Sequence, residues 1–240
     1  MKVTRFLLSA LFLGAMATSA SAQGIVDLSW DSCVGTTNKD IAGGTQASLY
    51  ASVIGHSAPH NGYEVQVVFG SGNAGALRDA WRFDNGGCQG ASFITIDHLA
   101  PAAVVKVCPT FSGTNSVLQI KEYEYDPLTG KAIGLLANAY PAGAPTLTPS
   151  QRYFLARFLF DHSFSVEGAT TPGADCGGLE VAVCGHLRVA KWNRLEGGEV
   201  DWAWGREYVT SRDAANATGC PGATPVENKT WGSLKAQYKR

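Results

Sequence analysis

The hydrophobic pattern of the chain is strongest in residues 151–168, where apolar side chains recur at every second position. The even positions carry four phenylalanines, whereas the odd positions are largely apolar up to residue 159 and polar from Asp161 onward. Because strand side chains alternate between two faces, this pattern predicts a strand buried on both faces at first and on one face afterwards. A helix beginning at Thr148-Pro149 is the alternative, but the phenylalanine row favours the strand. A strand this long is expected to bend or bulge near Asp161-His162.

Shorter apolar or alternating segments fill most of the remaining chain and are separated by turn residues. They are 26–30, 49–54, 63–69, 93–96, 103–107, 117–125, 131–140, 179–183, 186–192 and 199–210, while 76–83 fits either a short helix or a strand. Asp126-Pro127-Leu128-Thr129-Gly130 is a turn signal that joins two of them into a hairpin. Low charge and 28 glycines accompany this pattern. The sequence therefore predicts an all-β fold of about ten to twelve strands, with a jelly roll as the alternative to a sandwich.

A short motif before the long strand narrows the fold class. Leu147, Pro149 and Tyr153 form the spacing L-x-P-x-x-x-Y, which resembles the tyrosine corner of fibronectin type III and immunoglobulin-like sandwiches. The resemblance implies that the Tyr153 hydroxyl hydrogen-bonds to backbone upstream and that odd positions face the core, whereas the phenylalanines favour the even positions. In length and all-β pattern the chain is also similar to cohesins. We therefore expect an immunoglobulin-like or cohesin-like β-sandwich over residues 23–210, with 141–149 as the point where two smaller domains would divide.

The first residues have the pattern of a secretory signal peptide. Lys2 and Arg5 precede an apolar run at 6–17, and Ala20-Ser21-Ala22 is a cleavage signal that would leave Gln23 first. Removing residues 1–22 leaves 17 basic against 20 acidic residues, a net charge of −3, which excludes a basic surface for nucleic acid or anionic membrane. No later stretch approaches the ~18 apolar residues of a membrane span. The predicted location is the extracellular space, the cell surface or the periplasm.

Six cysteines remain after the signal peptide: Cys33, Cys88, Cys108, Cys176, Cys184 and Cys220. An even number in an exported chain predicts disulfides, and the C-x₂₋₄-C spacing of a zinc site is absent from the sequence. Proximity in the sequence suggests pairing Cys176 with Cys184 and Cys88 with Cys108, which leaves Cys33 for Cys220.

The sequence offers little support for catalysis. It has no G-x-S-x-G motif, and the neighbours Asp161, His162 and Ser163 would point to alternate strand faces. The spacing His56-x₃-His60 contains Pro59, which places both histidines in a loop rather than on one helix face. Glu122 and Glu124 share a strand face in the manner of a solvated surface pair. No metal and no cofactor are expected, and the prediction leans away from an enzyme.

Residues 199–210 carry the clearest candidate for binding. If they form one strand, Trp202, Trp204, Arg206 and Tyr208 share a face. An exposed aromatic row would form a stacking platform for sugar rings or a contact surface for protein, whereas a buried row would belong to the core. Arg206 within the row favours at least partial exposure.

The chain ends in a distinct segment. Residues 211–229 are rich in Ala, Asn, Thr, Gly and Pro, as in a linker, and Thr230 could cap a short helix with Trp231, Leu234 and Tyr238 on one face. The ending TWGSLKAQYKR is similar to C-terminal T-W-G-x-[LIV]-K-x-x-Y-[KR] segments of uncharacterised secreted bacterial β-sandwich proteins. This resemblance implies a tail that a sorting or anchoring partner reads.

These observations favour a secreted non-catalytic extracellular module with a structural, adhesion or assembly role, acting on an extracellular protein or glycan. A carbohydrate-binding module that uses the aromatic face is the first alternative, and a secreted hydrolase on a jelly-roll scaffold is the second.

Overall fold

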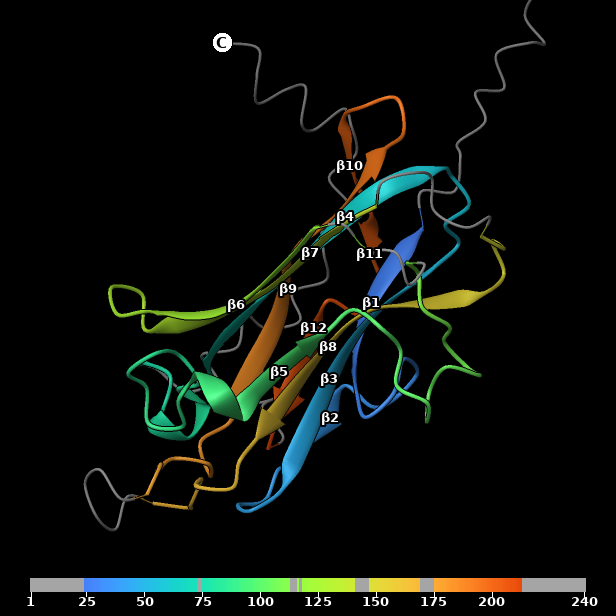
Figure 1. Ribbon diagram of the computed structural model, residues 1–240. Coiled ribbons are helices and arrows are strands. Elements are labelled where there is room, and N and C mark those ends of the chain that lie inside the picture. Colours follow the sequence, from blue (N-terminus) through green and yellow to red (C-terminus); the bar gives the residue numbers. More distant parts are fainter. Residues whose placement is uncertain are drawn as a thin grey trace, which may run out of the picture.

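The computed structural model describes residues 24–72, 75–112, 116, 118–140, 147–168 and 175–212. Two β-sheets pack face to face (Figure 1), which confirms the all-β sandwich. In order across sheet A lie β11 (Ala203–Trp204), β1 (Ile25–Trp30), β3 (Gln46–Ile54), β8 (Arg152–Asp161) and β5 (Ile94–Asp97). Across sheet B lie β2 (Asn38–Lys39), β12 (Tyr208–Ser211), β9 (Val183–Arg194), β4 (His60–Ser71), β7 (Lys131–Ala139) and β6 (Leu118–Asp126), while β10 (Glu199–Asp201) pairs with β9.

Strands that are distant in the sequence pair with each other in both sheets. β3 pairs with β8 and β4 pairs with β9, all antiparallel, so each sheet contains strands from before and after residues 141–146. The two parallel pairings of described strands involve the shortest strands, β11 with β1 and β2 with β12. No helix of the described residues is long and apolar enough to cross a membrane.

The core between the sheets is formed by the inward positions of the long strands. Phe69 on β4 packs against Phe158 and Phe160 on β8, and Trp81 packs on the same group. Trp81 belongs to the 3₁₀ turn η1 (Asp79–Trp81), and a second 3₁₀ turn, η2 (Ala91–Phe93), precedes β5. Residues 76–83, which fitted either a helix or a strand, therefore contain a single 3₁₀ turn, because Trp81 anchors the loop in the core.

A bulge in β8 reconciles the two registers predicted for this strand. In the pairing with β3, Ala156 lies opposite Ala51 and Phe154 lies opposite Ser52, so Leu155 is the extra residue. Before the bulge the odd residues face the main core, and after it the even residues do so. Phe154 instead joins a second cluster on the outer side of sheet A. The first half of the strand is thus buried on both faces, as predicted, although the bulge lies at Leu155 rather than near Asp161-His162.

The tyrosine-corner hydrogen bond is present. Tyr153 is buried, and its hydroxyl accepts a hydrogen bond of 2.8 Å from the backbone N–H of Thr148. The carbonyl of Pro149 accepts from Gly55 N–H at 3.0 Å, which fixes the same corner to the end of β3.

We expect Tyr153→Phe to lower the free energy of unfolding by about 1 kcal/mol, because the buried ring stays while the N–H of Thr148 loses its acceptor. Urea unfolding of both proteins measures the difference. Equal midpoints would show that this hydrogen bond does not stabilise the corner.

A loop covers the outer side of sheet A and is fixed there by a disulfide. Cys108 is bonded to Cys33 (Cα–Cα 6.2 Å), and together with Tyr50 and Val104 they enclose Phe154. The predicted strand at 103–107 is therefore wrong, since these residues form turns. Val104 packs on Phe154. The apolar residues at 103–107 therefore cover a sheet and do not form a strand of it.

The predicted disulfide pairings are wrong. Cys88 is bonded to Cys176 (Cα–Cα 5.6 Å) and Cys33 to Cys108, with separations of 88 and 75 residues. Cys184 is also disulfide-bonded, and Cys220 lies outside the described residues. Proximity in the sequence was misleading because the sandwich brings distant loops together, and closing such long loops restricts the unfolded chain more strongly.

One more predicted strand is wrong, and the predictions for the two ends of the chain fall outside the described residues. Residues 179–182 form a turn instead of a strand, and β9 begins at Val183. The signal peptide and the tail with Trp231, Leu234 and Tyr238 fall outside the described residues.

Candidate functional site

The predicted aromatic strand 199–210 is divided among three short strands. β10 belongs to sheet B, β11 adds to sheet A beside β1, and β12 returns to sheet B. The prediction of one continuous strand is therefore wrong. Strict alternation of faces does not hold when a chain crosses between sheets, so Trp202 and Trp204 come to lie in different environments.

Trp202 lies in the core. Its side chain is 2% exposed, its backbone N–H donates to Ala190 O at 2.9 Å, and its indole N–H donates to His56 Nδ1 at 3.1 Å. His56 Nε2 in turn lies 3.0 Å from Ala58 O. Because Nδ1 accepts from the indole, the ring hydrogen is on Nε2 and His56 is neutral.

Trp204 remains at the surface and forms an exposed aromatic patch with two other residues. Its side chain is 42% exposed, and its ring lies 6.2 Å from that of His186 on β9. His186 stacks on Tyr208 of β12 with ring centroids 4.7 Å apart and an interplanar angle of 21°. The pairing of β9 with β12 places Tyr208 directly opposite His186. We call Trp204, His186 and Tyr208 the aromatic patch.

The patch is uncharged but has titratable neighbours. Burial, and to a smaller extent the charge of Lys131, lowers the pKa of His186, so its imidazole is neutral at pH 7. Burial raises the pKa of Tyr208, with the Glu207 carboxylate adding to the effect, and burial also raises the pKa of Glu207. The patch therefore presents three neutral ring systems beside a carboxylate.

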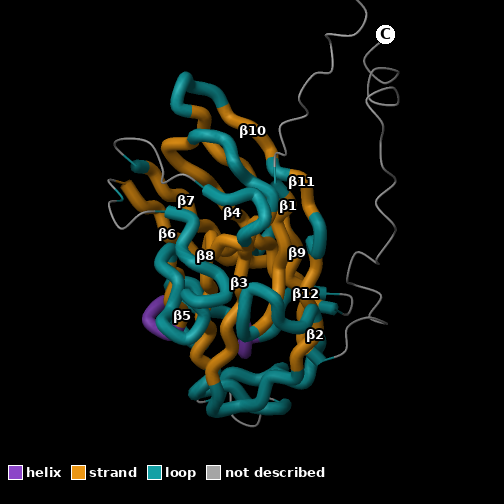
Figure 2. The backbone as a smooth tube through the Cα atoms, turned by 90° about the vertical axis from the view of Figure 1, so that its right-hand side faces the viewer, coloured by secondary structure: helices purple, strands orange, loops and turns teal. Residues whose placement is uncertain are grey.

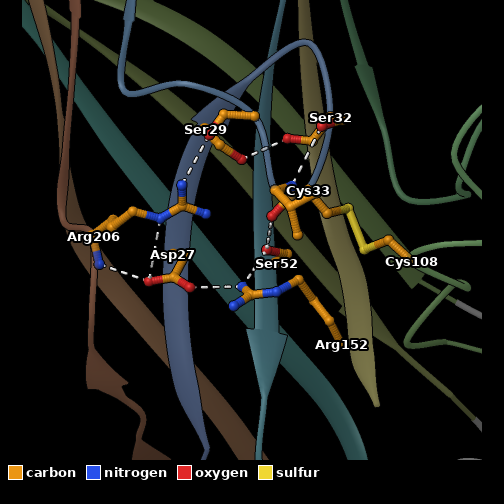
Figure 3. Close-up of polar contacts among 10 residues, drawn as sticks. Asp27, Ser29, Ser32, Cys33, Ser52, Cys108, Arg152 and Arg206 are labelled. Carbon is orange, nitrogen blue, oxygen red and sulfur yellow. Dashed lines mark hydrogen bonds and ion pairs between the residues drawn. A yellow bond between two sulfur atoms is a disulfide. The ribbon is translucent and has the colours of Figure 1, made fainter.

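Arg206 is held by the scaffold (Figure 3). Its Nη1 donates to Gly35 O at 2.9 Å, its backbone N–H donates to Asp27 Oδ1 at 2.6 Å, and its Nε lies 3.9 Å from the same oxygen. Arg152 Nη1 lies 2.7 Å from Asp27 Oδ2 and donates to Ser52 Oγ at 3.0 Å. Asp27 thus anchors the turn 204–208 to β1 and β8, and Arg206 positions Trp204 and Tyr208 rather than joining their surface.

The turn also depends on a glycine. A Cβ at Gly205 would lie 2.3 Å from Asp27 Oδ1 and 2.8 Å from a methyl of Ile25. Because real Cβ contacts do not reach such distances, any larger residue would push the turn away from β1. The position of Trp204 therefore follows from a close approach that only glycine permits at the next residue.

A charged cluster and a shallow hollow continue the outer face of sheet B beyond the patch. Arg188 is exposed on β9, and Lys191 farther along pairs with Glu64 and Glu199 at 3.0 Å each. The hollow, of about 150 Å³, includes Lys191 and the aliphatic side chain of Ile120 in its lining. A ligand that extends along β9 from the aromatic patch would meet hydrogen-bonding groups over this length.

His162, which lies between Asp161 and Ser163 in the sequence, is buried. His162 Nδ1 lies 2.8 Å from Ser165 Oγ, and Gln89 donates to the same oxygen. All three residues are buried beside the Cys88–Cys176 disulfide. Asp161 instead accepts from Ser163 at the surface. The serine of this pair is Ser165 and not the neighbouring Ser163, and both residues are buried, so the contact is a hydrogen bond within the core.

The other candidate pairs show no arrangement for chemistry. His56 and His60 are buried with ring centroids 5.1 Å apart, and His60 stacks on Phe111 at 4.1 Å. Within the described residues no group of three or more His, Cys, Asp or Glu is placed to hold a metal. Glu122 and Glu124 lie exposed on the edge strand β6.

Comparison with known proteins yields only distant likenesses. No protein-family model matches the sequence, and no curated protein matches it. A type II cohesin domain from the cellulosome of Acetivibrio cellulolyticus is 8% identical, with a TM-score of 0.39 over 79% of this chain and 95% of that chain. The cohesin module of a Clostridium perfringens family 33 glycoside hydrolase (8%, TM-score 0.36, 79% and 97%) and a non-cellulosomal cohesin from Archaeoglobus fulgidus (8%, TM-score 0.34, 78% and 89%) are comparable. Likeness at this level does not extend to ligand or activity.

Sequence reasoning found two members of the patch and missed the third. Trp204 and Tyr208 each contact His186, whereas Trp202 lies in the core and Arg206 bonds to Gly35 and Asp27. His186 begins the predicted strand 186–192, so its exposure could be anticipated from alternation. Its position opposite Tyr208 could not, because strand register across 22 residues is not encoded in either segment alone.

Proposed function

We propose that this protein is a non-catalytic binding module that works outside the cytoplasm and that its ligand is a carbohydrate held on the aromatic patch. The observation that carries the proposal is the surface group of exposed Trp204 with half-buried His186 and Tyr208, fixed by Gly205 and the Asp27 network on the outer side of the sandwich. Aromatic rings exposed on a rigid sheet bind with little loss of conformational entropy.

The chemistry of the patch suits sugar rings. A pyranose presents C–H groups that pack on an aromatic face, while its hydroxyls need hydrogen-bonding partners at the rim. Trp204 supplies the most exposed ring, and Arg188 together with the Lys191–Glu64 pair supplies donors and acceptors farther along β9. An extended oligosaccharide fits this arrangement better than a single sugar.

The predicted location outside the cytoplasm and the disulfide-bonded fold support this role. The Cys33–Cys108 and Cys88–Cys176 disulfides are typical of an oxidising environment, in line with the signal peptide predicted at residues 1–22. They fix loops that are distant in the sequence to one another.

We expect the protein to bind one or more oligosaccharides on a glycan array and Trp204→Ala to weaken that binding at least ~10-fold, since stacked aromatic anchors contribute more than about 1.4 kcal/mol. Phe164→Ala is the matched control, because Phe164 is also an exposed aromatic side chain but contacts Phe93 away from the patch. Thermal unfolding of each variant verifies that the fold is retained.

Three outcomes would count against the proposal. An array without any binding, or equal binding by wild type and Trp204→Ala, would rule out a carbohydrate as the ligand of the aromatic patch. Turnover of a glycan in place of stable binding would favour the hydrolase alternative. Retention of a protein by wild type but not by Trp204→Ala would instead make the patch an assembly surface.

A further inference from the structure

One side of the sandwich is left open by two edge strands. β5 is the last strand of sheet A and β6 the last strand of sheet B, and Figure 2 shows both on the same side of the molecule. In the described part of the chain β5 pairs only with β8 and β6 only with β7. Each strand therefore presents a row of backbone groups to which another strand could add.

A hollow of about 340 Å³ lies between these two edges. Phe83, Ile94, Ile96 and Tyr123 give it an apolar lining, and Lys121 and Asp97 stand at its rim. Tyr123 is fixed there by a hydrogen bond of 2.8 Å from its hydroxyl to Trp81 O. An added strand with apolar side chains on one face could fill this hollow and extend the main core.

The outer face of β6 is apolar at Leu118 and Ile120 and acidic toward its end. Glu122 and Glu124 are exposed, and Asp126 ends the strand, whereas Lys121 faces the hollow with Tyr123. A strand that pairs with β6 would therefore need apolar residues toward the hollow and basic residues on the opposite face.

We propose that residues 230–240 of the same chain pair with β6 as an additional strand of sheet B. Read with a period of two, Leu234, Ala236 and Tyr238 lie on one face, which ends in Arg240, while Lys235 and Lys239 lie on the other, which also carries Trp231. The segment contains no Asp or Glu. With Leu234, Ala236 and Tyr238 toward the hollow, the lysines lie on the same face as Glu122 and Glu124.

The chain can reach this edge. Four successive antiparallel pairings connect β12 with β6, so β12 runs parallel to β6 and ends at the same end of the sheet as Asp126. Four strand spacings amount to about 19 Å, and residues 213–229 can extend to more than about 50 Å. The tail would therefore arrive near Asp126 and run antiparallel to β6.

A second copy of the chain fits the same edge less well. When two β6 strands pair antiparallel, residues directly opposite each other lie on the same face of the sheet. Even-numbered residues must therefore lie opposite even-numbered ones, and odd opposite odd, if the two inner faces are to continue each other. The two centred registers place Glu122 opposite Glu122 or Lys121 opposite Lys121, and like charges in direct opposition are unfavourable. The basic tail avoids this repulsion.

Hydrogen–deuterium exchange of the full mature chain, measured by mass spectrometry on peptides covering residues 118–126, tests the proposal. We expect Lys235→Glu/Lys239→Glu to accelerate exchange of β6 about tenfold, within the range of two cross-strand charge pairs. Glu122→Lys/Glu124→Lys should do the same, and the variant with all four changes should recover the protection of wild type. Lys106→Glu, at an exposed site on the far loop, is the control and should leave β6 unchanged.

Leu234→Asp provides a test that does not depend on surface charge pairs, because it would place a carboxylate in the apolar hollow. This variant should also accelerate the exchange of β6. Exchange that is identical in wild type, Leu234→Asp and the double lysine variant would overturn the proposal. Failure of the four-change variant to recover protection would overturn the proposed orientation. If the protection of β6 grows with protein concentration and sedimentation shows a dimer, the strand that pairs with β6 is the tail of a second copy and not that of the same chain.

Discussion

Replacing Trp202 with alanine is expected to lower the free energy of unfolding by about 4 kcal/mol, within the range for truncating a buried aromatic residue. The indole is 2% exposed and lies 5.6 Å from His56, 5.4 Å from Phe111 and 6.4 Å from Tyr63, measured between ring centroids. Its loss would leave a cavity between the sheets and remove the donor to His56 Nδ1. Denaturant unfolding followed by circular dichroism measures the change.

Trp204→Ala is the matched control for this experiment because it deletes the same side chain two residues away. Its side chain is 42% exposed, so the expected loss of stability is below about 1 kcal/mol. Equal losses for the two variants would contradict the assignment of one tryptophan to the core and the other to the surface.

Mild acid is expected to destabilise the protein through two buried histidines. Burial lowers the pKa of His60 from 6.5 to about 4, and burial lowers the pKa of His162 to about 4 as well. Above pH 6.5 both residues are neutral whether the chain is folded or not. Between pH 6.5 and pH 4 the unfolded chain binds protons that the folded protein excludes, so stability falls as pH falls, by up to about 3 kcal/mol for each histidine.

The unfolding free energy measured between pH 7 and pH 4.5 tests this slope, because most carboxylates titrate at lower pH. His60→Phe removes one titrating group and keeps a ring to stack on Phe111, so it should reduce the slope by about half even if its stability at pH 7 differs. A slope that is unchanged in this variant would show that His60 is protonated in the folded protein.

The central strand shows how far a sequence pattern can reach. Alternation in residues 151–168 predicted β8 and its burial on both faces, because these depend on neighbouring residues in one strand. The resemblance of L-x-P-x-x-x-Y to the tyrosine corner implied the hydrogen bond of Tyr153. The bulge at Leu155 was misplaced, since it depends on which residues of β3 lie opposite. Pairing partners are a property of the whole fold, and local propensity does not specify them.

The candidate site was predicted only in part for a related reason. Trp202, Trp204 and Tyr208 share a parity, but the chain passes from sheet B to sheet A and back within 199–211, so parity no longer reports a common face. Gly205 marks the crossing, and its role is evident only when Asp27 is seen to lie against it. The disulfide pairings and the conformation of 103–107 were predicted wrongly because both depend on contacts between distant segments, and the two disulfides join residues 75 and 88 positions apart.

The surface role of Trp204 can be measured directly by ¹⁹F NMR of protein labelled with 5-fluorotryptophan, with the resonances assigned by Trp→Phe variants. The Trp204 resonance is expected to shift between H₂O and D₂O and to move when the oligosaccharides selected by the array are added, while the Trp202 resonance responds to neither. A Trp204 resonance that is insensitive to both solvent and oligosaccharide would contradict the assignment of the aromatic patch as the ligand-binding surface.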